Sequence, residues 1–226
     1  MNPKSVICNW KMSGTTELVD SFLTQCIEYP QLIIAMPTIF IAYTKNKLKS
    51  CKLAAQDCSI YSGFGAHTGE ISSSMLRDNG VEYVILGHSE RRLALNESVS
   101  VVFEKLSCTL QSGLTAILCV SENYKSLLDE ETTKLLQSNV EKVIIAYEPV
   151  SAIGTGKIPS VEEIEDALRE IKNKYHSVRT IYGGSVNSKN AESLLSIGCL
   201  DGLLIGGASL NPEEIKCILK IQSSNF

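Results

Sequence analysis

The segments VIIAY (residues 143–147), SVEEIEDALREI (residues 160–171) and TIY (residues 180–182) follow one another along the chain. The first and third are short, apolar and rich in β-branched residues, as expected of strands buried on both faces. The middle segment opens with the helix-capping pattern Ser160-Val161-Glu162-Glu163 and continues with apolar residues at helical spacing. This order predicts a strand, a crossover helix and a parallel strand.

The same alternation extends over the whole chain. Eight strand candidates occur, at residues 5–8, 32–36, 52–55, 83–86, 115–120, 143–147, 180–182 and 202–205. Strands that alternate with helices predict an α/β fold, and eight such units predict a (β/α)8 TIM barrel, a parallel eight-stranded barrel surrounded by helices. An open doubly wound sheet is the alternative, although no Gly-x-Gly-x-x-Gly motif follows a strand. No linker interrupts the series, so we expect residues 1–226 to form a single domain.

Composition narrows the classes of function. The chain has 44% hydrophobic and 20% charged residues and a formal net charge of -4, which is typical of a folded globular protein. The sequence has no dense Lys/Arg cluster of the kind that binds nucleic acid or an anionic membrane. It also has no apolar run that approaches the roughly 20 residues of a membrane span. The eight cysteines are scattered singly, which favours a reducing compartment. Without a signal peptide, the expected location is cytoplasmic.

Polar residues directly follow three of the predicted strands. Lys11 comes after the first strand, His88 after the fourth and Glu148 after the sixth. In an α/β barrel, the loops after the strands build the active site, so we expect these side chains to meet at one end. Each residue alone has an ordinary interpretation, as a solvated lysine, a core histidine or a surface glutamate. Their shared position favours a catalytic site instead.

Glycine pairs follow the last two predicted strands. Gly183-Gly184-Ser185 comes after the seventh strand and Gly206-Gly207 after the eighth. Glycines let the main chain approach an anion closely and present N–H groups to it. One Gly-Gly pair is usually only a turn, but two pairs at these positions predict a phosphate site.

Seven motifs occur in one order along the chain: NWKM (9–12), GAHTGEIS (65–72), ILGHSERR (85–92), AYEPV (146–150), AIGTG (152–156), YGGSV (182–186) and DGLLIGGASL (201–210). On these motifs the sequence resembles the triosephosphate isomerase family over essentially its whole length. The resemblance implies an intramolecular aldose–ketose isomerase of glycolysis and gluconeogenesis. It would interconvert dihydroxyacetone phosphate and D-glyceraldehyde 3-phosphate through an enediol(ate) by proton transfer. No cofactor and no metal is implied.

The resemblance also implies roles for individual residues. Glu148 would be the base at carbon, His88 the electrophile at the carbonyl oxygen and Lys11 the cation that offsets developing charge. Glu90 would pair with Lys11, and Thr68 would insert near Lys11 of a second subunit. The Ser62–Glu70 loop would then form a homodimer. The substrate-binding residues would be Asn9, Lys11, Gly154, Ser185, Gly206 and Gly207.

Two departures from the family pattern concern the loop at residues 149–157, which resembles a lid over the site. Ser151 stands where the family commonly has tryptophan, and Ser121 where it commonly has glycine.

Two other functions stay open on the residues alone. A Schiff-base aldolase would use Lys11 as nucleophile, and borohydride trapping would reveal it. The other is a non-enzymatic phosphate-binding or interaction protein whose barrel has lost its activity, which a coupled assay for glyceraldehyde 3-phosphate would distinguish.

Overall fold

The computed structural model describes residues 4–26, 28–122, 128–149 and 159–224. Its strands are all parallel and form a closed barrel, in which each strand pairs with the next along the chain and β8 pairs with β1. The predicted (β/α)8 TIM barrel is therefore confirmed. The strands are β1 (Ser5–Asn9), β2 (Leu32–Ala35), β3 (Lys52–Ala55), β4 (Val81–Leu86), β5 (Thr115–Val120), β6 (Val143–Tyr147), β7 (Arg179–Tyr182) and β8 (Gly202–Ile205).

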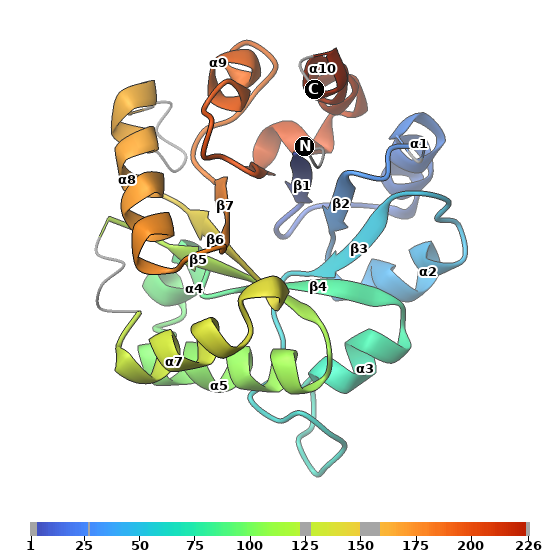
Figure 1. Ribbon diagram of the computed structural model, residues 1–226. Helices are drawn as coiled ribbons and strands as arrows, with labels where there is room; N and C mark the ends of the chain where they lie inside the picture. The colour runs from blue at the N-terminus through green and yellow to red at the C-terminus, as the bar shows by residue number, and fades with distance from the viewer. Residues whose placement is uncertain (1–3, 27, 123–127, 150–158, 225–226) are drawn as a thin grey trace.

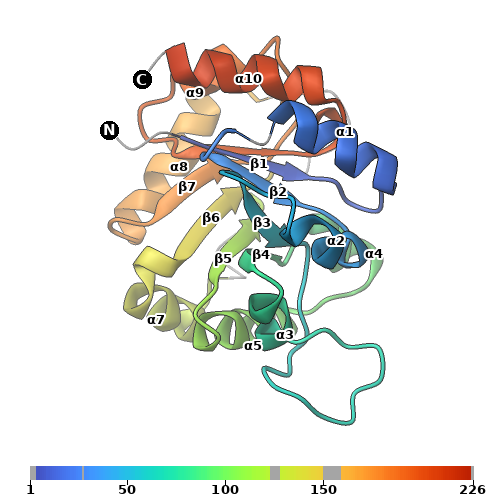
Figure 2. The ribbon, with the colours of Figure 1, turned by 90° about the vertical axis from the view of Figure 1, so that its right-hand side faces the viewer.

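Helices surround the barrel, as Figure 1 shows. They are α1 (Thr16–Cys26), α2 (Ile41–Lys45), α3 (Ser73–Asp78), α4 (Ser89–Ala94), α5 (Val99–Gln111), α7 (Glu130–Ser138), α8 (Val161–Lys174), α9 (Ala191–Leu195) and α10 (Pro212–Ser224). Short 3₁₀ helices are η1 (Thr38–Phe40), η2 (Val140–Lys142) and η4 (Gly207–Leu210). In Figure 2, α1 and α10 lie side by side next to β1. Among the described helices, none combines the length and the apolarity that a membrane crossing requires.

The strands are buried on both faces, which explains their continuous apolar sequences. In β1, Ile7 belongs to a cluster composed only of strand residues, which fills the inside of the barrel. Its neighbours Val6 and Cys8 belong to the larger cluster that the strands share with the helices. All three side chains are fully buried. Successive residues of a strand thus serve two separate apolar layers.

Helix α8 begins where its sequence pattern predicts. The Ser160 hydroxyl accepts a hydrogen bond from the Glu163 backbone N–H at 3.2 Å, and the Glu163 carboxylate accepts one from the Ser160 N–H at 2.7 Å. This reciprocal pair satisfies donors that the first helical turn leaves free. The helix then buries Ile164, Leu168 and Ile171.

Strand β4 is longer than the sequence pattern predicts. It begins at Val81 rather than at Tyr83. Val81 is buried, but Glu82 is exposed and interrupts the apolar run.

The carboxyl ends of β1, β4 and β6 meet at the same end of the barrel because all the strands are parallel. The segments that follow them, with Lys11, His88 and Glu148, therefore lie close together.

Candidate active site

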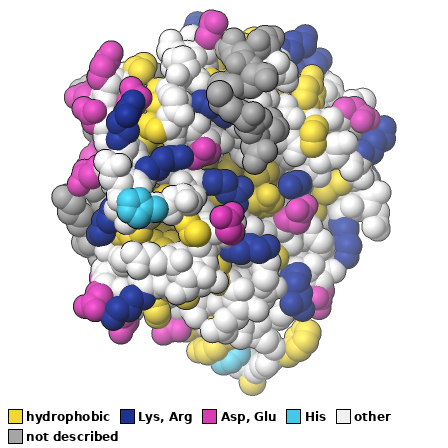
Figure 3. Space-filling model, viewed as in Figure 1, with side chains coloured by type: hydrophobic (Ala, Val, Ile, Leu, Met, Phe, Trp, Pro, Cys, Tyr) yellow, Lys and Arg dark blue, Asp and Glu magenta, His cyan; other side chains and the backbone are white. Residues whose placement is uncertain are grey.

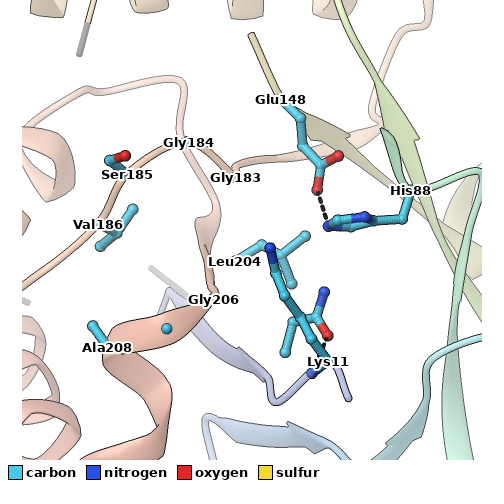
Figure 4. A pocket seen from close by; sticks show the side chains of 12 residues that line it. Lys11, His88, Glu148, Gly183, Gly184, Ser185, Val186, Leu204, Gly206 and Ala208 are labelled. Carbon is cyan, nitrogen blue, oxygen red and sulfur yellow. Dashed lines mark hydrogen bonds and ion pairs between the residues drawn. The ribbon is translucent and has the colours of Figure 1, made fainter. Parts of the chain in front are cut away.

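A pocket with a volume of about 210 Å³ lies at this end of the barrel. Its walls come from the ends of β1, β4 and β6 and from the segments after β7 and β8 (Figure 4). The residues predicted to catalyse or to bind substrate that line it are Asn9, Lys11, His88, Glu148, Ser185, Gly206 and Gly207. Segments far apart in the sequence thus contribute to a single site.

Lys11 occupies an unusual turn after β1. Its φ of 53° lies in the left-handed region, which is uncommon for a residue other than glycine. The Asn9 side-chain oxygen accepts a hydrogen bond from the Lys11 backbone N–H at 3.1 Å and so supports this turn. The Lys11 ammonium is 2.5 Å from a Glu90 carboxylate oxygen. Figure 4 shows the Lys11 side chain extending toward the middle of the pocket.

His88 is the N-cap of helix α4, and its ring orientation is defined by hydrogen bonding. The Nδ1 atom accepts a hydrogen bond from the Glu90 backbone N–H at 3.2 Å. A ring nitrogen that accepts carries no proton, so the proton of the neutral ring is on Nε2. Nε2 lies 3.4 Å from Oε1 of Glu148 and faces the pocket (Figure 4). The ring can therefore present an N–H donor to a substrate oxygen.

Glu148 follows β6 and is only 1% exposed. Burial raises the pKa of its carboxyl group above the ordinary value, whereas nearby His88, the Cys119 thiol, the Ser89 backbone N–H and the Lys11 ammonium lower it. The Ser89 N–H donates to Oε2 of Glu148 at 3.5 Å. A buried carboxylate with a raised pKa, in a pocket beside a histidine, has the character of a general base.

Glycine is required beside this carboxylate. A side-chain carbon at Gly183 would lie only 2.8 Å from Cγ of Glu148. The main chain after β7 therefore packs directly against the base, and a larger residue would displace it.

The main chain after β8 forms the neighbouring part of the wall, since β8 pairs with β7. Helix η4 begins at Gly207, and a side-chain carbon there would meet no atom within 4 Å. At Gly206 such a carbon would lie 3.3 Å from Cε of Lys11. Gly207 therefore presents its backbone to open space in the pocket, where an anion can approach the N–H groups closely. The Lys11 ammonium adds positive charge on the same side.

Among the described residues, two predicted ones, Glu90 and Thr68, are not part of this lining. Glu90 contributes through its ion pair with Lys11. Thr68 lies in the exposed loop after β3 and lines a separate cavity of about 490 Å³. Gly154 lies outside the described residues, as does Ser151. Ser121 is described and is buried at the end of β5.

Sequence reasoning missed the apolar part of the lining and one hydrogen-bond donor. Leu204, Val186 and Ala208 line the pocket, and the backbone N–H of Ser89 contacts Glu148. The position of Ser89 directly after His88 was a signal for the donor. No comparable signal marked Leu204, because in the sequence it is one of several equivalent apolar residues of β8.

The described residues hold no group of three or more His, Cys, Asp or Glu side chains arranged to bind a metal ion. The pocket lining supplies a carboxylate, an imidazole, an ammonium group and backbone groups.

Comparison with known proteins assigns a family. The model of the triosephosphate isomerase family matches residues 4–222. A triosephosphate isomerase of Thermodesulfovibrio yellowstonii is 35% identical over 246 residues, covering 97% of this chain and 100% of the relative. One of Shewanella loihica is 34% identical, with 96% of each chain covered. The cytosolic triosephosphate isomerase of Oryza sativa subsp. japonica is 37% identical, with 93% of each covered. The chain belongs to the triosephosphate isomerase family.

Proposed function

We propose that Glu148, His88 and Lys11 together catalyse the interconversion of dihydroxyacetone phosphate and D-glyceraldehyde 3-phosphate. This is the reaction of the family to which the chain belongs, and it serves glycolysis and gluconeogenesis. One observation supports this assignment most strongly. The Glu148 carboxylate is only 1% exposed and lies 3.4 Å from Nε2 of His88, in a pocket that Lys11 also lines.

The reaction needs two proton transfers at carbon and two at oxygen. Glu148 takes a proton from C1 of dihydroxyacetone phosphate, and the carbonyl oxygen takes the Nε2 proton of His88, which leaves an enediol. His88 then recovers a proton from the hydroxyl on C1, and Glu148 delivers its proton to C2. A glutamate base with a neutral histidine is the arrangement characteristic of this family. Lys11 offsets negative charge on the enediolate oxygens.

The phosphate group is assigned to the backbone of Gly206 and Gly207, with Ser185 and Gly154 completing the site. Asn9 supports it through the Lys11 turn. We call the segments that contain Ser185, Gly206 and Gly207 the phosphate cup. Binding of the dianion in this cup supplies binding energy away from the reacting carbons, and that energy holds C1 in line with the base.

Gly207→Val is expected to weaken phosphate binding. The valine side chain would occupy the open space beside the backbone N–H groups of Gly207 and keep the anion away from them. We expect KM for dihydroxyacetone phosphate and the inhibition constant of inorganic phosphate to rise together, each by roughly 10-fold or more, which corresponds to about 1.4 kcal/mol. Equal phosphate affinity in variant and parent would remove this loop from the site.

The rate should fall in acid at a pH set by Glu148. Burial raises the pKa of this carboxyl group above the ordinary 4.5, and only its ionised form can act as a base. Activity is therefore retained above the raised pKa and lost as the pH falls through it. We expect the acid limb of kcat/KM to have its midpoint above 4.5. If the substrate concentration is calculated as the concentration of the phosphate dianion, the ionisation of the substrate phosphate, near pH 6, no longer contributes to the profile. A midpoint at or below 4.5 would contradict the buried base.

The proposed reaction is tested by incubating the purified protein with dihydroxyacetone phosphate in D₂O. A coupled dehydrogenase would detect glyceraldehyde 3-phosphate, and NMR would locate deuterium on C2, because a protonated Glu148 exchanges with solvent. Borohydride added during turnover distinguishes the aldolase alternative. Covalent trapping of substrate on Lys11, or the absence of any product, would overturn the proposal.

We also propose that the Ser62–Glu70 loop forms a homodimer interface. The loop projects from the barrel in Figure 2, and Figure 3 shows hydrophobic side chains and a histidine at the lower edge, where it lies. Phe64 is 84% exposed, and Met12, next to Lys11, is 98% exposed. Large apolar side chains exposed on a projecting loop support an interaction surface when they form a contiguous patch.

Thr68→Glu should produce monomers with little activity. A carboxylate placed in the interface would be desolvated without a partner, which is costly. Sedimentation velocity at micromolar concentration would measure the assembly, and Thr24→Glu, at an exposed position on α1, is the matched control. A parent-like dimer in Thr68→Glu would place the interface elsewhere.

Two further assignments follow the family. We propose that residues 1–226 form one domain and that the protein is cytoplasmic. The cytosolic relative in Oryza sativa supports the location.

A further inference from the structure

Arg92 lies on helix α4 and hydrogen-bonds to both peptide groups that contain His88. Its side-chain Nε–H donates to the Gly87 carbonyl at 2.8 Å. Its backbone N–H donates to the His88 carbonyl at 3.2 Å. The Arg92 side chain thus holds the carbonyl before the His88 α-carbon, and its backbone N–H shares the carbonyl after it with the Arg91 N–H, which donates at 2.9 Å.

The Gly87 carbonyl belongs to a constrained turn. Gly87 has a φ of +64°, and a side-chain carbon there would lie 3.1 Å from Val102 and 3.6 Å from the Cys119 carbonyl oxygen. Gly87 is also buried. A buried carbonyl without a donor is costly, and this turn decides the direction in which the chain leaves β4. The Arg92 guanidinium supplies the donor.

The charge of Arg92 is not used in a surface ion pair. Over residues 4–26, 28–122, 128–149 and 159–224, no carboxylate lies within salt-bridge distance of Arg92. This differs from Arg91, which pairs with Asp57 and Glu97. Burial and the nearby Glu148 carboxylate raise the pKa of the Cys119 thiol, and the positive charge of Arg92 acts against that rise. Cys119 in turn lies beside Glu148.

We propose that Arg92 is the positioning residue for His88: by holding the Gly87–His88 turn, it directs the His88 Nε2–H toward the substrate oxygen. The inference rests on the proposed role of His88 and adds a residue that does not itself contact substrate. The Nδ1 hydrogen bond from Glu90 selects the tautomer, whereas the Arg92 contact places the backbone from which the ring projects. Each contact constrains a different degree of freedom.

Arginine suits this task because its guanidinium is planar and directs its N–H groups along fixed lines. Arg92→Met keeps the length of the side chain but removes the donor. A displacement of a catalytic group by about 1 Å can cost ~100-fold in rate. We therefore expect kcat to fall by roughly 10- to 100-fold in Arg92→Met, with KM within about twofold of the parent, because the phosphate cup on β7 and β8 is untouched. The kcat of Arg92→Lys should lie between those of the parent and Arg92→Met.

The experiment compares kcat, KM and the imidazole ¹⁵N spectrum of His88 in the parent, Arg92→Met, Arg92→Lys and Arg77→Met. Arg77 is a matched control, since its Nη1 also donates to a backbone carbonyl, that of Ser112 at 3.2 Å, but far from the pocket. The inference expects a lower kcat and altered His88 nitrogen shifts only in the Arg92 variants. If Arg92→Met does not fold, Arg92→Lys decides the question by the same two measurements.

His88→Gln is measured in parallel to separate two kinds of failure. If His88→Gln keeps the parent kcat, the proposed role of His88 is wrong, and the role of Arg92 is overturned with it. If His88→Gln loses activity while the Arg92 variants keep parent kcat and parent His88 shifts, the inference alone is overturned. A fall in kcat with unchanged His88 shifts would assign Arg92 to general stability, which also overturns it.

Discussion

Glu148→Gln should lower kcat by roughly 100- to 10,000-fold, the range that a positioned general base contributes. Glutamine matches glutamate in shape, so the variant removes basicity while the buried site stays filled. Replacing a buried carboxylate by an amide also removes a desolvated charge, so the fold should not be weakened. The phosphate cup contains none of the altered atoms, and KM should change little. A loss confined to kcat would identify a group that acts in the transition state.

Glu148→Asp provides a second measure of the same base. Shortening the side chain by one methylene withdraws the carboxylate by about 1 Å, for which a loss of ~100-fold is expected. Glu213→Gln is the control, since Glu213 lies on α10 with 70% of its side chain exposed. Steady-state rates in both directions of the reaction would be compared. If kcat in Glu148→Gln stays within tenfold of the parent, the base must be another residue.

Much of the fold was predictable because barrel strands are buried on both faces. The apolar run VIIAY coincides with β6 (Val143–Tyr147), and the run at residues 115–120 coincides with β5. An error arose where a strand has an exposed residue, since Glu82 concealed the start of β4. Periodicity alone left an open sheet as an alternative. The pairing of β8 with β1, which closes the barrel, excludes it.

The site was predictable where its residues follow strand ends and less so where it depends on contacts between distant residues. Lys11, His88 and Glu148 could be placed together because parallel strands bring their carboxyl ends to one side. The hydrogen bond from the Ser89 N–H to Glu148 joins residues 59 positions apart, so the sequence could mark the donor, directly after His88, but not its pairing with Glu148. The support that Arg92 provides for His88 likewise depends on the left-handed turn at Gly87, which only the structure reveals.

Four charged residues that the sequence analysis did not single out form a network around the buried side chain of Lys105. Lys105 donates to both carboxylate oxygens of Asp57, at 2.8 and 2.7 Å, and also to Glu97. Arg91 pairs with the same two acids. The side chain of Lys105 is 7% exposed and that of Glu97 is 4% exposed. Asp57 and Lys105 are 48 residues apart, so their pairing has no signature in the sequence.

Lys105→Met should destabilise the fold by about 3 to 5 kcal/mol, the cost of removing one partner from a buried ion pair. Methionine fills a similar volume, but among the described residues Asp57 and Glu97 would then share only the Arg91 cation, and Oε2 of Glu97 already has no hydrogen-bond partner there. Lys47→Met is the matched control: Lys47 pairs with Asp20 at 2.6 Å, but its side chain is 38% exposed, so a cost of at most about 1 kcal/mol is expected.

Urea unfolding would measure both variants at one protein concentration, because self-association makes apparent stability depend on concentration. The signal is the fluorescence of Trp10, the single tryptophan, which is 1% exposed in the folded state. Adding Asp57→Asn to Lys105→Met should restore part of the lost free energy, because it removes one of the carboxylates left without a full complement of cations. Equal midpoints for Lys105→Met and Lys47→Met would show instead that water reaches the network and screens it, as it screens an exposed pair.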